Sequence, residues 1–489
     1  MTDSARADIL ADMNTLTLRD PRVVIVLVLS AVLIGIASAT SPLLAFAGLV
    51  AVVALVVAWV DPVVYVVALI ALAPLFDVGV VSLGPVDVQF MEMAWFLAFG
   101  MIVLRALLAR PVGLSKVPLW AIALPAAIVL WEAATALTSV VPTRSVIEAG
   151  QTGYLALVMI VTAAAVGSLD VRGRIRLALT SAWSFLGLFV VSMFWHYGLK
   201  QAFPRVVIDS AGVNIAGGLI KVQAAGAADI TLERFGLVNI GPVASAVVFI
   251  VVLVFSLAAL LDKRAARYRL LSLAVVAASG FGLLLTYSRA GWLVGAGVIW
   301  LLSVKAGPRR MLLLTLLLVA LVGAASLHPA VSARLQEFTD LSEGSFAVHV
   351  RMWVTAIWMT TARPLTGWGP GAFKEIAPGL GIGTEYWPWM ANQDTHNWVL
   401  QASSESGVVG AAILVSLVLG LLAATLRTAV RRPGLLAFSP WVAAVSVVLM
   451  NLTLNTFRTE ITWVTLGILL ATLMWKDAGD PAPSEAGDA

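Results

Sequence analysis

Long, uninterrupted apolar runs are the feature that most constrains how this chain can fold. The first, "RVVIVLVLSAVLIGIASAT", begins at Arg22, and similar runs recur to the end of the chain. A bilayer core takes about 20 apolar residues per helix, and lipid admits only helices and closed barrels because every backbone polar group must be paired. The runs lack the apolar–polar alternation that barrel strands require. The sequence therefore predicts an all-α polytopic membrane protein.

The composition agrees with this prediction, since 60% of the residues are hydrophobic, only 12% are charged and the mean hydropathy is +0.97. We identify about fourteen apolar segments. The third is short and ends at Pro74, so it can be re-entrant, and we expect about 12 to 14 transmembrane helices. The segments lie near residues 22–40, 43–60, 62–76, 88–108, 117–138, 145–167, 175–198, 238–261, 268–287, 288–304, 310–328, 398–426, 437–455 and 459–475.

The first apolar segment ends in Ala37-Ser38-Ala39, which resembles a signal-peptide cleavage site. The segment is long for a signal peptide, and many more spans follow it. We therefore favour an uncleaved first span, with a cleaved signal peptide as the alternative.

The distribution of basic residues predicts an orientation. With a cytoplasmic N-terminus and alternating spans, dense Lys/Arg clusters fall on the inner side, as the positive-inside rule requires. Such clusters include Arg172, Arg174 and Arg176. The predicted divisions are a cytoplasmic N-terminal segment (1–21), an N-terminal transmembrane bundle (22–198), an extracytoplasmic loop (199–237), central transmembrane helices (238–328), a large extracytoplasmic loop (329–397), C-terminal transmembrane helices (398–475) and a disordered cytoplasmic tail (476–489).

The loop at 329–397 is too long for a simple connector, and long ordered loops are usually functional. It contains "HVRMWVTAIWMTTARPLTGWGPGAF". Apolar residues recur in its first half at helical spacing, which predicts an amphipathic helix lying on the outer membrane surface; they are Val350, Trp353, Val354, Ile357 and Trp358. Gly and Pro in "GWGPGAF" end that helix. We therefore expect short helices in this loop.

Several classes of chemistry are excluded or disfavoured by what the sequence lacks. It has no cysteine, which excludes disulfides, thiolate catalysis and cysteine-based metal sites. It has no Walker motif, no GxGxxG after a strand and no HExxH, which argues against ATP hydrolysis and zinc proteolysis. We expect no metal, no cofactor and no nucleic-acid partner.

The predicted topology gathers polar residues at the outer face, where they are costly and usually mark function. They include all four histidines, His196, His328, His349 and His396. Arginines there suit a phosphate group, because guanidinium offers fixed bidentate donors and keeps its charge. The candidates are Arg234, Arg289, Arg351 and Arg363.

Each arginine also has a plainer interpretation. Arg289 in "TYSRAGWLVG" can reach lipid headgroups, and Arg234 can pair with its neighbour Glu233. Arg351 and Arg363 can lie on solvated surfaces. Arg458 and Glu460, in "NTFRTEITW", most simply form a local ion pair at the outer rim.

His396 follows Asp394 and Thr395, either of which can cap a helix that starts there. Such a helix places His396, Leu400 and Ser403 on one face. His396 is then a candidate general base, since neutral imidazole accepts a proton from a hydroxyl, or else an interfacial histidine bonded to the loop. Glu405 lies nearly opposite, so we interpret it as a supporting residue that holds an arginine.

Three stretches, "TYSRAGWLVG", "RPLTGWGPGAF" and "THNWVLQASSESGVVGAAI", resemble signature segments of the O-antigen ligase and polymerase superfamily, and "RFGLVNIGPVASA" is similar to a further one. The resemblance covers about residues 230–425. Members typically have a dozen or more spans and a large periplasmic loop late in the chain. A helix that opens with a histidine follows that loop.

The resemblance implies an enzyme of the bacterial cytoplasmic (inner) membrane that transfers a glycan from undecaprenyl pyrophosphate to an acceptor hydroxyl at the periplasmic side, without a metal. It implies that Arg234, Arg289 and Arg351 bind the pyrophosphate and that His396 acts as the general base. Arg289 also acts in catalysis, and Glu405, Arg363 and Asn397 support the site. The acceptor is a glycan, a lipid-linked repeat unit or a protein hydroxyl.

Two other classes of function stay open. A transporter or flippase of a lipid-linked glycan or anionic solute has polar residues near the midplane on several helices, and Glu92, Glu132 and Glu148 are compatible with it. The second class is a non-catalytic partner in a polysaccharide assembly complex. This hypothesis predicts that His396 and Arg289 can be replaced without loss of function.

Overall fold

The computed structural model describes most of the chain beyond its first sixty residues. The described residues are 54, 56–58, 61–72, 79–83, 86–107, 116–200, 204–209, 212–217, 222–225, 230–237, 241–336, 344–380 and 393–475. The first two predicted apolar segments, 22–40 and 43–60, and the predicted tail at 476–489 lie wholly or mostly outside these residues.

Each of the other twelve predicted apolar segments forms a helix, because a long apolar run in lipid pairs its backbone only as a helix. These helices are α4 (Pro62–Leu72), α5 (Phe90–Leu107), α6 (Leu119–Ala136), α7 (Pro142–Ser168), α8 (Val171–Met193), α9 (Pro242–Leu261), α10 (Arg269–Leu285), α11 (Arg289–Ala306), α12 (Pro308–Ala325), α17 (Trp398–Arg431), α18 (Leu435–Met450) and α19 (Glu460–Ala471). Within the described part of the chain, eight helices are long and apolar enough to cross a membrane, and four apolar helices are shorter. The fold is an all-α polytopic membrane protein, as predicted.

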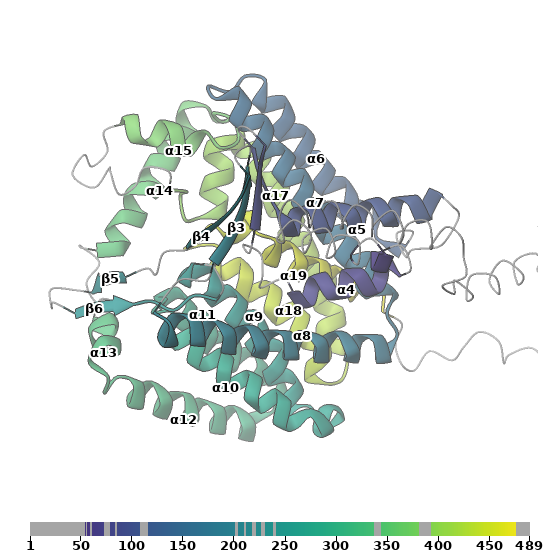
Figure 1. The fold of residues 1–489 in the computed structure, drawn as a ribbon, viewed down its shortest axis with the longest axis vertical. Coiled ribbons are helices and arrows are strands. Elements are labelled where there is room, and N and C mark those ends of the chain that lie inside the picture. Colours follow the sequence, from purple (N-terminus) through teal and green to yellow (C-terminus); the bar gives the residue numbers. More distant parts are fainter. Residues whose placement is uncertain are drawn as a thin grey trace, which may run out of the picture.

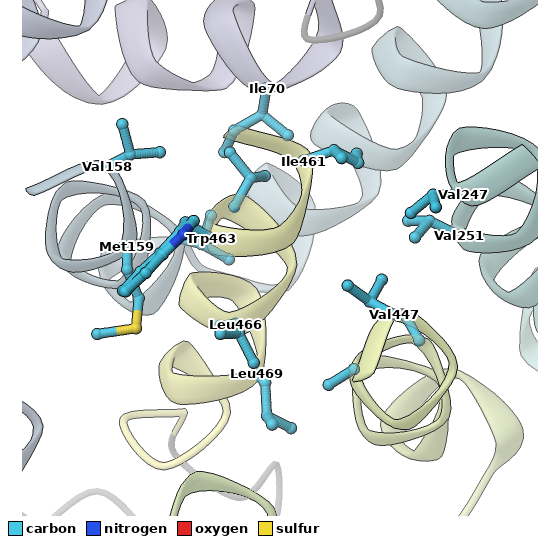
Figure 2. Packing of buried hydrophobic residues seen from close by; sticks show 14 of the residues in the cluster. Ile70, Val158, Met159, Val247, Val251, Val447, Ile461, Trp463, Leu466 and Leu469 are labelled. Atoms are coloured by element: carbon cyan, nitrogen blue, oxygen red, sulfur yellow. The ribbon is translucent and has the colours of Figure 1, made fainter. Parts of the chain in front are cut away.

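The core of the bundle surrounds α19. Side chains of α19 face α7 on one side, and α18 and α9 lie beside them (Figure 2); the labelled residues include Trp463, Leu466, Leu469, Val158, Met159, Val447 and Val247. Gly467 allows α19 to approach α7 closely, because a Cβ at this position would lie 2.6 Å from the Met159 carbonyl oxygen. Small residues at such contacts are typical of membrane helix packing. In contrast, α12 lies along the outer edge of the bundle and has no buried residue (Figure 1).

The connecting segments hold strands that the apolar pattern did not predict. A four-stranded sheet has the order β2-β1-β3-β4, and β1 pairs with β3 in parallel. β5 and β6 form a separate antiparallel pair. The strands are β1 (Gly79–Leu83), β2 (Val86–Gln89), β3 (Pro204–Asp209), β4 (Gly212–Gly217), β5 (Val222–Ala225) and β6 (Ile230–Glu233). Four of them fall in the 199–237 loop, where short β-branched runs alternate with turn residues, a pattern that favours strands.

The 329–397 segment contains short helices, as expected: α13 (Pro329–Gln336), α14 (Gly344–Ala362), α15 (Ala372–Ile376) and the 3₁₀ helix η5 (Ala377–Leu380). α14 and α15 lie together on one flank of the bundle (Figure 1). One face of α14 buries Met352, Ala356 and Met359 against Phe373. The predicted apolar face is largely exposed; its exposed residues are Val350, Val354, Ile357 and Trp358. Its placement on the membrane surface stays a prediction.

One end of the bundle carries cations that complete the C-termini of helices. Lys305 Nζ donates hydrogen bonds to the carbonyl oxygens of Val430 at 3.3 Å and Arg432 at 3.1 Å. The Arg432 guanidinium donates to the carbonyls of Thr472 and Trp475, just beyond α19. The last carbonyls of a helix have no partner within it, so these bonds satisfy them. Lys305 and Arg432, which the predicted topology places on the inner side, therefore lie together at this end.

Candidate functional site

The turn between α10 and α11 is one part of the candidate site. It lies at the end of the bundle opposite to Lys305 and Arg432. Ser288 caps α11, since its hydroxyl accepts a hydrogen bond from the Gly291 N–H. Arg289 is the first residue of α11. Tyr287 has φ of 50°, in the left-handed region that L-residues rarely adopt. The sequence "TYSRAGW" therefore builds a tight turn that presents an arginine at a helix N-terminus, where anions are favoured.

Two further arginines converge on this turn from distant parts of the chain. The Arg234 Nε–H donates to the Thr286 carbonyl oxygen at 2.8 Å. The Arg334 Nε–H donates to the Tyr287 carbonyl oxygen at 3.2 Å, and Arg334 is buried. Arg234 therefore contacts the turn that precedes Arg289, and the role of the two arginines as a phosphate clamp stays a prediction. The alternative partner of Arg234, the Glu233 side chain, lies outside the described side chains.

Two histidine rings lie in contact next to the N-terminal end of α17. The ring centroids of His349, on α14, and His396 lie 5.0 Å apart with the ring planes at 46°. The ring of Trp353, one helical turn after His349, is stacked on it at 6.3 Å. His396 has φ of 54°, again left-handed. Such strain costs on the order of 1–3 kcal/mol and is concentrated at functional sites, so the strained backbone supports a functional role for His396.

Both imidazoles are held in their neutral form. Burial, followed by the charges of His396 and Arg289, lowers the pKa of His349 to about 4. Burial also lowers the pKa of His396, although Asp394 acts in the opposite direction. The Lys374 ammonium, 3.3 Å from Asp394, contributes to the lowering for His396. Neutral imidazole has one acceptor nitrogen and one donor nitrogen, so each ring can accept a proton.

The predicted start of the helix after His396 was wrong. α17 begins at Trp398, and its cap is Asn397, whose Oδ1 accepts hydrogen bonds from the N–H groups of Val399 and Leu400. Asp394 and Thr395 do not cap it. His396 therefore precedes the helix and does not share a helical face with Leu400 and Ser403. The amide of Asn397 also donates to the Leu452 carbonyl, which joins this turn to the end of α18.

Glu405 holds an arginine, as predicted, and the partner is Arg458. Glu405 is 2% exposed, and its Oε2 lies 2.6 Å from an Arg458 guanidinium nitrogen. The other side of Arg458 pairs with Glu148 on α7 at 2.6 Å. The predicted local pair between Arg458 and Glu460 was wrong, because the Glu460 carboxylate accepts from the Tyr154 hydroxyl on α7.

A chain of hydrogen bonds connects this ion pair to His396. Glu405 Oε1 accepts from the side-chain amide of Gln401, and Gln401 Oε1 accepts from the Thr395 N–H at 2.9 Å. Thr395 is completely buried and directly precedes His396. Glu405, Gln401 and Arg458 therefore fix the backbone that carries the histidine.

The "GWGPG" stretch fits against a kink in α17. The kink lies at Gly407, with φ of 68° and ψ of 179°. It leaves the Ser404 and Glu405 carbonyls to accept from the N–H groups of Trp368 and Gly369, at 3.1 and 2.8 Å. A Cβ at Gly407 would lie 2.1 Å from the Leu365 carbonyl oxygen. The glycines thus let two backbones touch, and this contact aligns the loop with the helix that follows His396.

Two other predicted site residues, Arg363 and Arg351, lie in different surroundings. Arg363 stacks its guanidinium on the Trp368 ring, 4.2 Å from the centroid. Arg351 is half-buried on α14, about 200° around the helix axis from His349. The roles of both residues in the site remain predictions.

Sequence reasoning did not single out several residues of this end. They are His349, Arg334, Lys374, Gln401 and the pairing of Arg458 with Glu148. His349 was noticed only as one of the outer histidines, and nothing in its local sequence indicates contact with a residue 47 positions away. Within the described residues, no group of three or more His, Asp or Glu side chains is arranged to hold a metal ion.

Part of the chain matches a known protein family. The sequence model described as O-antigen ligase matches residues 273–415. The matched segment begins in α10 and contains the Thr286–Arg289 turn, α14, the glycine-rich loop, His396 and the first half of α17. No curated protein matches the chain.

Proposed function

We propose that this chain, whose residues 273–415 match the O-antigen ligase family, transfers a glycan from undecaprenyl pyrophosphate to an acceptor hydroxyl. A ligase- or polymerase-type role in polysaccharide biosynthesis follows from the family. The observation that carries the finer proposal is the convergence of Arg289, His349 and His396 within the matched segment.

The arginines act on the leaving group. Arg289 at the N-terminus of α11 binds the pyrophosphate together with Arg234, which is hydrogen-bonded to the preceding turn, and Arg351 contributes to the same group. Negative charge develops on the pyrophosphate as the bond to the sugar breaks. Fixed cations and helix dipoles aimed at that charge stabilise the transition state without reorganisation.

His396 acts on the acceptor. A hydroxyl is a poor nucleophile until a base takes its proton, and a neutral imidazole held by a fixed backbone is suited to that task. Glu405 acts through Gln401 and Thr395 to hold His396, and Asn397 fixes the helix that follows. Arg363, stacked on Trp368, supports the glycine-rich loop.

The decisive experiment reconstitutes the purified protein in lipid with an undecaprenyl-pyrophosphate-linked oligosaccharide and candidate acceptors. We expect release of undecaprenyl pyrophosphate with glycan moved to one acceptor class, loss of this activity in His396→Ala, and retention in the control His328→Ala. EDTA should leave the activity intact. Loss on chelation, restored by one metal, would require a different site.

The same assay separates the competing functions. A transporter moves the lipid-linked glycan across the vesicle bilayer without breaking its bond to pyrophosphate. A non-catalytic partner gives neither product, and its His396 and Arg289 can be replaced without loss in cells. Equal turnover by wild type and a folded His396→Ala variant would show that His396 is not the general base.

We also propose that the site faces the extracytoplasmic side of the bacterial inner membrane. Basic residues gather at the opposite end of the bundle, which favours a cytoplasmic location for that end. Reporter fusions at Gly344 and Gly307 should give opposite signals. Equal signals would overturn the orientation.

A further inference from the structure

His349 is placed to share a proton with His396. It enters the site from α14, whereas His396 enters from the turn before α17, and their rings meet at 5.0 Å. Trp353 stacks on His349 and limits its ring orientation. The two rings are in contact, so rotation of the His396 ring can bring one of its nitrogens to a nitrogen of His349. The pair therefore forms where α14 packs on α17.

The charged groups around the pair are known from each neighbouring element. Arg289 on α11 acts on His349, Lys374 on α15 and Asp394 in the preceding loop act on His396, and the two histidines act on each other. Two cations and one carboxylate thus surround two imidazoles. Burial opposes a positive charge on either imidazole, so the pair holds a proton only transiently.

We propose that His349 is a proton-relay residue of the transfer reaction that receives, from His396, the proton taken from the acceptor hydroxyl. The inference rests on the proposed function. The acceptor oxygen bonds to the anomeric carbon, and the bond from that carbon to the pyrophosphate oxygen breaks with its electron pair left on the pyrophosphate. The proton passes from the hydroxyl to His396, then to His349, and finally to the departing pyrophosphate near Arg289.

This relay explains why a second histidine is useful here. His396 must be neutral again before the next acceptor arrives. His349 contacts His396, and the charge of Arg289, the arginine that binds the leaving group, acts on His349. The relay therefore regenerates the base and neutralises charge on the pyrophosphate in the same step.

The test compares wild type with His349→Gln and His349→Ala, with His328→Gln as a matched histidine control. We expect kcat to fall by about 100-fold in both His349 variants, within the range typical of proton-transfer groups. The KM for the donor should change little, and imidazole added to His349→Ala should restore much of kcat. Thermal unfolding in lipid nanodiscs checks that each variant is folded.

A second measurement does not depend on activity. NMR titration of labelled histidines should show the pKa of His349 rising when His396 is replaced by Gln, because a neighbouring charge is removed. An unchanged titration, a fully active His349→Gln variant, or a loss that imidazole does not restore would each overturn the relay alone. Wild type that transfers no glycan with any donor overturns the proposed function and the relay together.

Discussion

The two ends of the helical bundle use charged side chains in different ways. At the predicted inner end, two cations complete helix termini: Lys305 binds carbonyls at the end of α17, and Arg432 binds carbonyls after α19. At the site end, Arg458 is held by two carboxylates, Glu148 from α7 and Glu405 from α17. Both kinds of contact join separate helices, but the first pairs a cation with neutral backbone carbonyls, whereas the second pairs a cation with charged side chains.

This difference determines what each end loses when its cation is replaced. A lysine at a helix C-terminus is favoured by the helix dipole and by unpaired carbonyls. The Arg458 network exists only when α7, α17 and the turn before α19 are packed together. Because the network leads through Gln401 to Thr395, the position of His396 reports on the assembly of the whole site end.

The largest effect is expected for Arg458→Ala. The substitution leaves the buried Glu405 carboxylate without its cation, and breaking a buried pair in this way costs about 3–5 kcal/mol. We expect a lower unfolding temperature in lipid nanodiscs and loss of transfer activity. The triple variant Arg458→Met, Glu405→Gln and Glu148→Gln removes all the charges and should regain most of the stability. Wild-type stability of Arg458→Ala would show that the network is dispensable.

Arg289→Lys is expected to have the next largest effect. A lysine keeps the charge but lacks the planar, bidentate donors that match a phosphate. Loss of one transition-state donor typically costs about 100-fold in kcat, so Arg289→Lys should be nearly as impaired as Arg289→Ala. Arg310→Lys, at the other end, is the matched control and should retain activity. A fully active Arg289→Lys variant would reduce Arg289 to a headgroup anchor.

Local signals in the sequence were enough to predict the helices. A long apolar run in lipid has only one way to pair its backbone, so the existence of each described span followed from its own residues. The exact start of α17 did not follow. Asp394, Thr395 and Asn397 can each cap a helix, and Asn397 does so because its side chain meets two N–H groups.

The site was only partly predictable, because its contacts join distant segments. The need of Glu405 for a cation followed from its buried position, but the identity of Arg458, 53 residues away, did not. Proximity in sequence suggested a pair of Arg458 with Glu460. In the fold the two diverge, since Glu460 opens α19 and faces Tyr154. The contact of His349 with His396 likewise required the packing of α14 on α17.

The stability of the site end should depend on pH more than that of the inner end. Burial, with the charges of His396 and Arg289, lowers the pKa of His349 from 6.5 to about 4, so the unfolded chain binds a proton in this interval that the folded chain does not. The contribution of His349 to the free energy of unfolding is therefore fully present above about pH 6.5 and is lost as the pH falls toward 4. A pKa difference of one corresponds to about 1.4 kcal/mol, and we expect a loss on the order of 2 kcal/mol.

The measurement compares unfolding of wild type and His349→Gln at pH 7.5 and 4.5. The difference between the two proteins isolates the histidine from the carboxylates that titrate in the same interval. His349→Gln should lose less stability on acidification, and His328→Gln serves as the control. An identical pH dependence in wild type and His349→Gln would contradict the burial of the neutral imidazole.

The smallest effect is expected at the inner end, for Lys305→Met. Methionine keeps an apolar chain near Phe438, over whose ring the Lys305 ammonium lies at 4.7 Å, but it cannot donate to the carbonyls of α17. Hydrogen bonds from a charged donor contribute about 1.5–3 kcal/mol, and the remaining packing reduces the net loss to about 1 kcal/mol. We expect slightly easier unfolding in nanodiscs and unchanged transfer activity per folded molecule. A large loss of activity with retained stability would show that the two ends are coupled, and the division between capping and catalysis would then be wrong.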